Sequence, residues 1–283
     1  MTNIVLLYDR IRWEEKQLHT KAEERGINLE LVDARELLLT LPDSDGIPSD
    51  IVLQRCVSHS KGTHVAEYFE SHGSLVINSS LSGRLCGDKL STSLTLAKAG
   101  IPHPKTYVAF SKERALNAAE NLGYPVISKP LNGSWGREIA LLSDARSLKS
   151  YLELKENSSD PEDHIFYLQE FVENPGRDIR SVCVGDQIVA SIYRNAPLDD
   201  WRSNVALGGE AKPCQLHEEE QELVLKSADA VGGEIVGVDA MESPRGFLIH
   251  EVNSNVEFRG ATSGSGVDVA GRILDYLTER ASK

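Results

Sequence analysis

An alternation of short apolar runs with amphipathic segments, over the first third of the chain, constrains the fold most strongly. NIVLLYD predicts a buried strand, EEKQLHTKAEERG predicts an amphipathic helix that ends at Gly26, and INLELVD predicts a second strand. DIVLQRC, HVAEYFESHG and SLVIN repeat the strand, helix, strand pattern. Residues 1–85 are therefore predicted to form a small parallel α/β domain. No GxGxxG follows the first strand, so a nicotinamide-binding domain has little support.

The composition excludes several classes of protein. A chain of 283 residues with 40% hydrophobic and 26% charged residues predicts a globular core. Its net charge of −13 argues against a nucleic-acid or anionic-membrane binder. No apolar run approaches the roughly 18 residues of a membrane span, and the first residues lack signal-peptide features, so a cytoplasmic protein is expected. The four cysteines form no CxxC pair and predict neither a zinc cluster nor a disulfide framework.

The rest of the chain reads as two further parts. DKLSTSLTLAKAG and KERALNAAENLG predict helices, and YPVISKPLNGSWGREIALLSD predicts a strand, a small-residue loop and another strand. From residue 166 onward the strands alternate as in an antiparallel sheet. EEEQELVLKSADAVGG and VDVAGRILDYLTERASK predict two helices that pack on this sheet.

Two lysines lie where phosphates are often bound. Lys129 ends an apolar strand just before LNGSWGRE, where Gly133 and Gly136 allow close backbone approach and Ser134 and Arg137 offer donors. This combination suits a polyphosphate, although an ordinary glycine turn has the same residues, and it is not a Walker A loop. Lys89 begins a helix, where backbone N–H groups favour anions; a solvated lysine is the alternative.

Other polar residues are candidates for anion binding. Asp178 and Arg180 lie two apart on one predicted strand and share a face, and an exposed cross-strand ion pair is the alternative interpretation. The loop YRNAPLDDWRSNVALGGE contains Arg194, Arg202 and Asn204 around a glycine pair. It is either a polar loop or an anion-binding one.

Three oxygen-bearing side chains predict a metal site. Glu251 and Asn253 lie two apart on a strand and point the same way, and Asp239 ends the apolar strand before it. If these strands pair, the three side chains converge as ligands of Mg²⁺. Oxygen ligands alone do not separate Mg²⁺ from Mn²⁺.

Taken in order, GDK, VISKP, NGSWGR, LQEFV, GRDIR, RSN, VD and EVN resemble the ATP-grasp superfamily along nearly the whole chain. The set is most similar to the RimK-like branch and to its LysX and ArgX ligases, whose hallmarks include YDRIR, CGDK, GSWGR and GRDIR. The resemblance implies an α/β ATP-grasp fold, α+β in the ATP-binding part. It divides the chain into an N-terminal parallel α/β pre-ATP-grasp domain (1–85), a central subdomain with the glycine-rich lid (86–165) and a C-terminal subdomain with the metal site (166–283).

The resemblance also assigns roles to residues. Those implied to bind ATP are Lys89 and Lys129 at the phosphates, Gly133, Ser134, Trp135, Gly136 and Arg137 in the lid, Gln169, Glu170, Phe171 and Val172 at the adenine hinge, and Asp178, Arg180 and Asn204. The implied metal ligands are Asp239, Glu251 and Asn253. The substrate-binding candidates are Arg194, Val205, Ala206, Glu257, Phe258, Arg259, Gly260 and Ala261. The candidate catalytic residues are Lys129, Arg180 and Arg194.

The implied reaction activates a carboxylate as an acyl phosphate, which an amine then attacks. In this family the carboxylate belongs to the terminal glutamate of LysW, a small acidic carrier protein, and the amine to glutamate or 2-aminoadipate. In EFRGATSG, Gly260 matches the glutamate type but Ala261 matches neither, while the loop after Arg194 resembles the ArgX version. The sequence thus favours glutamate, with 2-aminoadipate as a second substrate, in arginine or lysine biosynthesis.

Three alternatives stay open: a RimK-like enzyme that adds glutamate to a protein tail, a ligase that forms small peptides, and a nucleotide sensor without activity. An acidic carrier would need a local basic patch on this acidic chain, for which the candidates are Arg10, Arg12, Lys61 and Arg84. A homodimer or tetramer is expected from the family.

Overall fold

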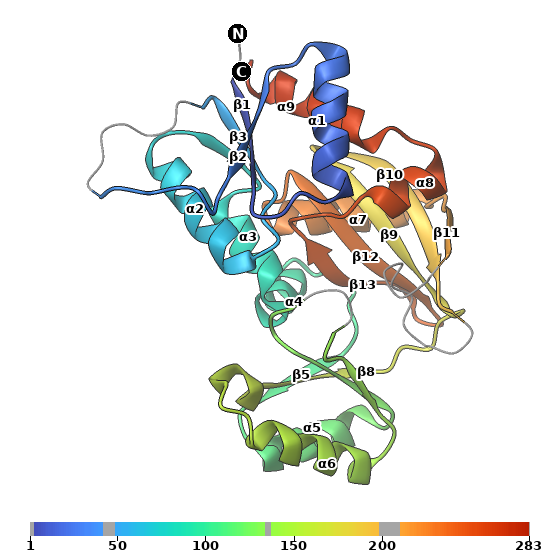
Figure 1. Cartoon of the computed structure of the whole chain (residues 1–283). Coiled ribbons are helices and arrows are strands. Elements are labelled where there is room, and N and C mark those ends of the chain that lie inside the picture. Colours follow the sequence, from blue (N-terminus) through green and yellow to red (C-terminus); the bar gives the residue numbers. More distant parts are fainter. Residues whose placement is uncertain (1–2, 42–48, 134–136, 198–209, 283) are drawn as a thin grey trace.

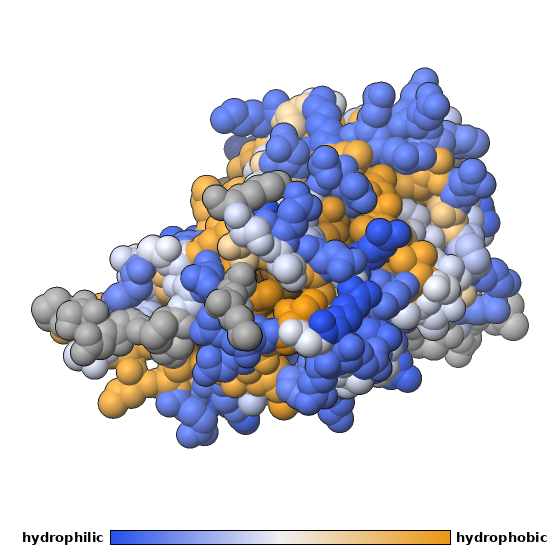
Figure 2. Space-filling view, turned by 90° about the horizontal axis from the view of Figure 1, so that it is seen from above, coloured by the Kyte–Doolittle hydropathy of each residue, from blue (hydrophilic) through white to orange (hydrophobic). Residues whose placement is uncertain are grey.

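The computed structural model describes residues 3–41, 49–133, 137–197 and 210–282, which form three sheets with helices packed on them (Figure 1). The central sheet and its helices form the lower lobe in this view, while the other two sheets lie together above it. Figure 2 shows one face, on which hydrophilic residues surround apolar areas. Within the described part of the chain, no helix is both long enough and apolar enough to cross a membrane.

The N-terminal sheet is parallel, with the order β2-β1-β3-β4. Its strands are β1 Ile4–Tyr8, β2 Leu29–Asp33, β3 Ile51–Gln54 and β4 Leu75–Ile77, and its helices are α1 Trp13–Arg25 and α2 His59–Ser71. Gly26 ends α1 with a φ of 66°, a left-handed conformation that glycine adopts without strain. The predicted parallel α/β start is confirmed.

The central sheet is antiparallel, with the order β5-β8-β6-β7. Its strands are β5 Thr106–Ala109, β6 Val126–Lys129, β7 Ala140–Leu142 and β8 Phe166–Glu170. Helices α5 Lys112–Leu122 and α6 Ala145–Glu156 cover one face (Figure 1), and a short 3₁₀ helix, η1 Pro161–His164, leads into β8.

The C-terminal sheet is also antiparallel, with the order β11-β10-β9-β12-β13. Its strands are β9 Arg177–Val184, β10 Gln187–Asn195, β11 Glu210–Pro213, β12 Ile235–Ser243 and β13 Gly246–Asn253. The helices around it are α3 Ser80–Gly87, α4 Lys89–Lys98, α7 Glu218–Ala230, α8 Arg259–Ser265 and α9 Val269–Arg280. Both α7 and α9 pack on the sheet, as predicted.

One hydrophobic core joins the N-terminal and C-terminal sheets. It contains Ile4 and Leu6 of β1, Val182 of β9, and Ile273 and Leu277 of α9. Polar contacts support the junction. The buried Arg55 donates to the carbonyl of Val256 at 2.8 Å, and Asn78 Nδ2 donates to the carbonyl of Ile235 at 2.6 Å. These two sheets therefore form a single packed unit.

The sheets differ from the predicted division of the chain in two places. Strand β8 pairs with β5 and β6, so the central sheet extends to Glu170, past the predicted boundary at residue 165. Helix α4, predicted for the central part, packs against β13 and α7, with Leu96 in the core of the C-terminal sheet. The apolar face of this helix explains the difference, because it is buried against the larger sheet.

Candidate active site

A cavity of about 980 Å³ lies where the three sheets meet. The central sheet contributes Lys129, the start of α4 contributes Lys89, and the C-terminal sheet contributes Arg180, Asp239 and Glu251. The N-terminal domain closes one side with residues from the segments that follow β1 and β3, namely Arg12, Trp13, Cys56 and Val57. The cavity thus collects most of the polar residues that the sequence singles out.

Strands β9, β10 and β12 build a buried cluster of arginines and aspartates. Arg194 lies opposite Asp178 in the β9–β10 pair, and Arg180 lies opposite Asp239 in the β9–β12 pair. Arg194 donates to both oxygens of Asp178, at 2.7 Å and 2.5 Å, and Arg180 Nη2 donates to Asp239 at 2.7 Å. The predicted alternative of an exposed cross-strand ion pair is correct about the cross-strand pairing but wrong about the exposure, since both pairs are largely buried.

Burial and charge act in opposite directions on this cluster. Burial alone would raise the pKa of Asp239, but the charges of Arg180 and Arg194 outweigh it and hold that pKa well below its usual range. Burial would lower the pKa of Arg194, but Asp239 and Asp178 raise it. Asp239 and Arg194 are therefore ionised at neutral pH and present fixed charge to the cavity.

The predicted oxygen ligands converge as expected. Asp239 lies opposite Glu251 in the β12–β13 pair, and Asn253 Nδ2 lies 3.4 Å from an oxygen of Asp239. Glu251 is half-buried and lines the cavity, and its carboxylate has neither a hydrogen bond nor an ion pair within the described residues. Two carboxylates and an amide suit Mg²⁺, and an unpartnered half-buried carboxylate fits a site that receives a cation.

Sequence reasoning missed His250. Ala240 pairs with Ile249, which leaves His250 as an extra residue in β13, a β-bulge. Both His250 and Glu251 line the cavity, although strict alternation would place them on opposite faces. Neither ring nitrogen of His250 has a hydrogen-bond partner in the part of the chain that is described. Burial and nearby Lys129 lower its pKa, so the ring is neutral at physiological pH.

Lys129 lies at the end of β6 with its amine buried in the cavity. Its Nζ donates to Gln169 Oε1 at 2.7 Å, and Gln169 in turn donates to the hydroxyls of Thr106 and Tyr167. Burial lowers the pKa of Lys129 to about 8, while the charge of Glu251 opposes the shift. Across the cavity, Lys89 Nζ donates to the carbonyl of Gly133 at 3.0 Å, which ties α4 to the glycine loop.

The pKa of Lys129 predicts a pH dependence of nucleotide binding. Only the protonated amine attracts a phosphate, and in the free protein this form is lost as the pH rises through about 8. The affinity for Mg·ADP should therefore fall above pH 8, by up to about tenfold per pH unit. Calorimetric titration from about pH 7 to about pH 9 measures this fall.

Lys129→Arg is the matched variant, since arginine keeps its charge across this range. Its affinity for Mg·ADP should vary little with pH, whatever its absolute value. The same slope in both proteins would contradict the assignment of the titration to Lys129.

The expected hinge and lid are only partly described. The side chain of Gln169 faces Lys129, while Glu170 accepts from the backbone N–H of Lys105 at 2.6 Å and Val172 is buried. Phe171 follows β8 directly, and Arg137 lines the cavity. Of the other predicted residues, Ser134, Trp135, Gly136, Asn204, Val205 and Ala206 lie outside the described residues.

The substrate candidates do not all reach the cavity. Arg194 lines the cavity, but its guanidinium is held by both oxygens of Asp178, and its role toward a substrate carboxylate stays a prediction. Phe258 is fully buried and does not line the cavity. Its ring centroid lies 5.8 Å from that of Trp13, which does line it. Glu257, Gly260 and Ala261 line the cavity, with Glu257 3.3 Å from Arg12. Arg259 is exposed and lines it as well, which makes it the remaining cationic candidate.

Comparison with protein families agrees with this geometry. The model of the RimK-like ATP-grasp domain matches residues 86–277, and that of the LysX preATP-grasp domain matches residues 4–84. The chain belongs to the RimK-like ATP-grasp family. It is therefore an ATP-grasp ligase, and the cavity between its sheets is the candidate active site.

Named relatives narrow the family further. The chain is 37% identical to the alpha-aminoadipate–LysW ligase LysX of Sulfurisphaera tokodaii, over 98% of this chain and 99% of the relative. It is 34% identical to the glutamate–LysW ligase ArgX of the same organism, over 99% of both chains. Among solved structures, a RimK domain ATP-grasp protein from Sphaerobacter thermophilus matches with a TM-score of 0.80 and 25% identity, covering 98% of this chain and 99% of that one.

Proposed function

We propose that this ATP-grasp ligase joins the α-amino group of glutamate to the side-chain carboxylate of the terminal glutamate of LysW, and that it also accepts 2-aminoadipate. The product would enter arginine or lysine biosynthesis. The observation that carries the proposal is the cavity itself, where Lys129, Asp239 and Glu251 meet in a chain related to LysX and ArgX over its length.

The residues present fit a nucleotide and a divalent cation. Mg²⁺ would be held by Asp239, Glu251 and Asn253 and would offset charge on the phosphates. Asp239 would share its oxygens between the cation and Arg180, whereas Glu251 has no competing partner among the described residues. Mn²⁺ suits the same oxygen ligands.

The charged side chains of the cavity account for the rest of the chemistry. The carboxylate oxygen of the acceptor would attack the γ-phosphorus of ATP and release ADP, with Lys129 and Arg180 offsetting the charge on the transferred group. The amine would then attack the acyl carbon and release phosphate. Because the acyl phosphate forms on the acceptor itself, the protein needs no nucleophile of its own.

The choice of amino acid depends on few residues. Relatives named for 2-aminoadipate and for glutamate have similar identities to this chain, so the support for glutamate is Gly260 and the sequence of the loop after Arg194. Ala261 is small and lies in the wall of the cavity, so it leaves space for the longer side chain of 2-aminoadipate. A difference of one methylene is worth only about 1–3 kcal/mol in such a pocket.

An ADP-release assay tests the proposal. Purified protein with Mg·ATP and a LysW-type carrier should release ADP with glutamate and with 2-aminoadipate, and the carrier should gain the mass of one amino acid. A preference above about two-hundredfold for one acid would contradict the dual substrate. ADP release with small-molecule pairs and none with the carrier would instead support a peptide-forming ligase. The cytoplasmic location and the homo-oligomer expected from the sequence stay predictions.

A further inference from the structure

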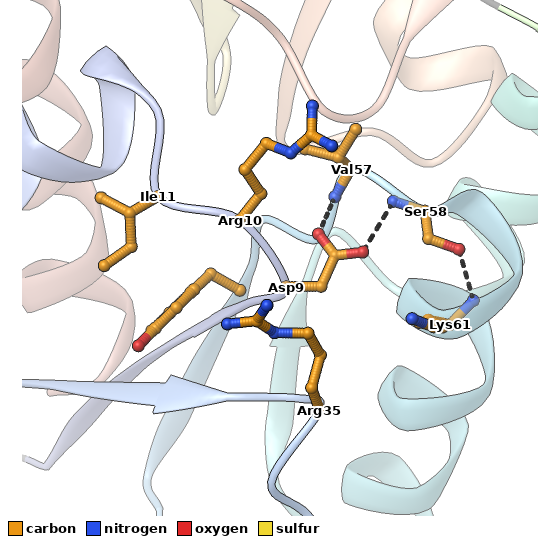
Figure 3. Close-up of a pocket in the computed structure, with 8 residues that line it drawn as sticks. Asp9, Arg10, Ile11, Arg35, Val57, Ser58 and Lys61 are labelled. Atoms are coloured by element: carbon orange, nitrogen blue, oxygen red, sulfur yellow. Dashed lines mark hydrogen bonds between the residues drawn. The ribbon is translucent and has the colours of Figure 1, made fainter.

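A second cavity, of about 620 Å³, lies at the carboxyl edge of the N-terminal parallel sheet. Figure 3 shows three cationic residues around it, which come from three segments: Arg10 from the loop after β1, Arg35 from the turn after β2, and Lys61 from the first turn of α2. The same loop supplies Ile11, whose side chain is exposed. Three cationic side chains and an exposed apolar side chain thus line this second cavity.

Two of these cations lack partners. Arg35 is bound to Asp33, with Nη2 to Oδ2 at 2.6 Å, so its charge is neutralised. Asp9, the one carboxylate among the described residues that line this cavity, accepts from the backbone N–H groups of Val57 and Ser58 at 2.7 Å and 3.1 Å. The side chains of Arg10 and Lys61 form no hydrogen bond or ion pair within the described residues. The cavity therefore offers an anionic ligand two cations without a hydrogen-bonded or ion-paired partner, although Asp33 is close enough to interact with Lys61 through charge.

Arg10 and Lys61 are two of the four residues in the basic patch predicted from the sequence. The other two, Arg12 and Arg84, are ion-paired. Arg12 contacts Glu15 at 2.8 Å and Glu257 at 3.3 Å, and Arg84 is ion-paired with Glu67. Their charges are already offset by these carboxylates.

The second cavity adjoins the candidate active site. The loop after β1 separates the two cavities, with Arg10 and Ile11 on one side and Arg12 and Trp13 on the other. Val57 lines both cavities. This shared wall allows one extended peptide to contact both cavities.

We propose that this second cavity binds an acidic peptide segment of the acceptor, just before the residue whose carboxylate is activated. The inference rests on the proposed function, because it places the acceptor's terminal glutamate in the first cavity. Arg10 and Lys61 bind carboxylates of the segment, and Ile11 contacts its apolar atoms. A peptide is favoured over a small anion because the cations stand on separate elements and the second cavity adjoins the active site at Val57.

The double variant Arg10→Gln/Lys61→Gln tests this site in the whole chain. The KM for the carrier should rise about tenfold, because each exposed charge contact is worth up to about a factor of five, while kcat stays within about twofold. The matched control is Arg114→Gln/Lys149→Gln, which removes one exposed arginine and one exposed lysine from the helices of the central sheet. Its KM should be unchanged.

Direct binding separates this inference from the proposed function. A fluorescein-labelled peptide of glutamate and glycine that ends in glutamate should bind the wild-type chain without ATP, more weakly as salt increases, and should bind the double variant at least about fivefold more weakly. Equal affinity, or an unchanged KM for the carrier, would overturn the proposal. So would displacement of the peptide by inorganic phosphate at an equal concentration, which would indicate a small-anion site. If no acceptor supports ADP release, the proposed function fails. The peptide-binding measurement still decides whether the second cavity binds an acidic peptide.

Discussion

Replacing Arg194 by methionine is expected to lower the free energy of unfolding by about 3–5 kcal/mol. The guanidinium is buried and holds both oxygens of Asp178, and it also lies 3.3 Å from Asp239. Methionine would fill part of the space but would leave the Asp178 carboxylate buried without a strong partner, since His250 lies 3.9 Å away and is neutral. Urea unfolding followed by circular dichroism measures the loss.

A surface arginine gives the comparison. Arg280 pairs with Glu234 at 2.7 Å, but its side chain is about one-third exposed, so Arg280→Met should cost at most about 1 kcal/mol. Equal losses in the two variants would contradict a special role for burial. A second variant, Arg194→Met/Asp178→Leu, removes both charges and should recover part of the lost stability, because it no longer leaves an unpaired carboxylate at position 178.

Glu251→Gln should lower the rate of ADP release by about a hundredfold to a thousandfold without unfolding the protein. The carboxylate faces the cavity and has no partner within the described residues, so it contributes to cation binding rather than to packing. An amide of the same shape keeps one oxygen ligand but loses the charge that holds Mg²⁺. The rate of ADP release against Mg²⁺ concentration measures both effects.

The loss in Glu251→Gln should be partly recovered at high Mg²⁺, because weaker cation binding is offset by mass action. Glu30→Gln, on an exposed position of β2, is the control and should behave like the wild type. Full activity of Glu251→Gln at low Mg²⁺ would remove Glu251 from the cation site. A fall in unfolding free energy above about 1 kcal/mol would instead indicate a structural role.

Much of the cavity could be predicted because strand alternation is a strong signal. Glu251 and Asn253 share a face for that reason, and Asp239 meets them since β12 and β13 are neighbours in sequence and pair directly. Lys129 was also predictable, as the charged end of an otherwise apolar strand. Local pattern thus identified the residues that come from consecutive strands.

Partners across the sheet were not predictable from local pattern. Arg194 pairs with Asp178 because β9 and β10 align in one particular register, and a shift of one residue would separate them. The β-bulge that directs His250 into the cavity leaves no mark on the spacing of apolar residues. The position of α4 on the C-terminal sheet depends on tertiary packing in the same way. These features are set by long-range contacts, which a single sequence does not display.

The core shared by β1 and α9 has a consequence for folding during synthesis. Ile4 and Leu6 are translated long before the apolar side chains of α9 that share their core, such as Ile273 and Leu277. Contacts between residues so distant in sequence form slowly, because a long loop must close before they are made. The nascent N-terminal sheet is therefore expected to keep apolar surface uncovered until α9 has been translated, and surface of this kind is prone to aggregation.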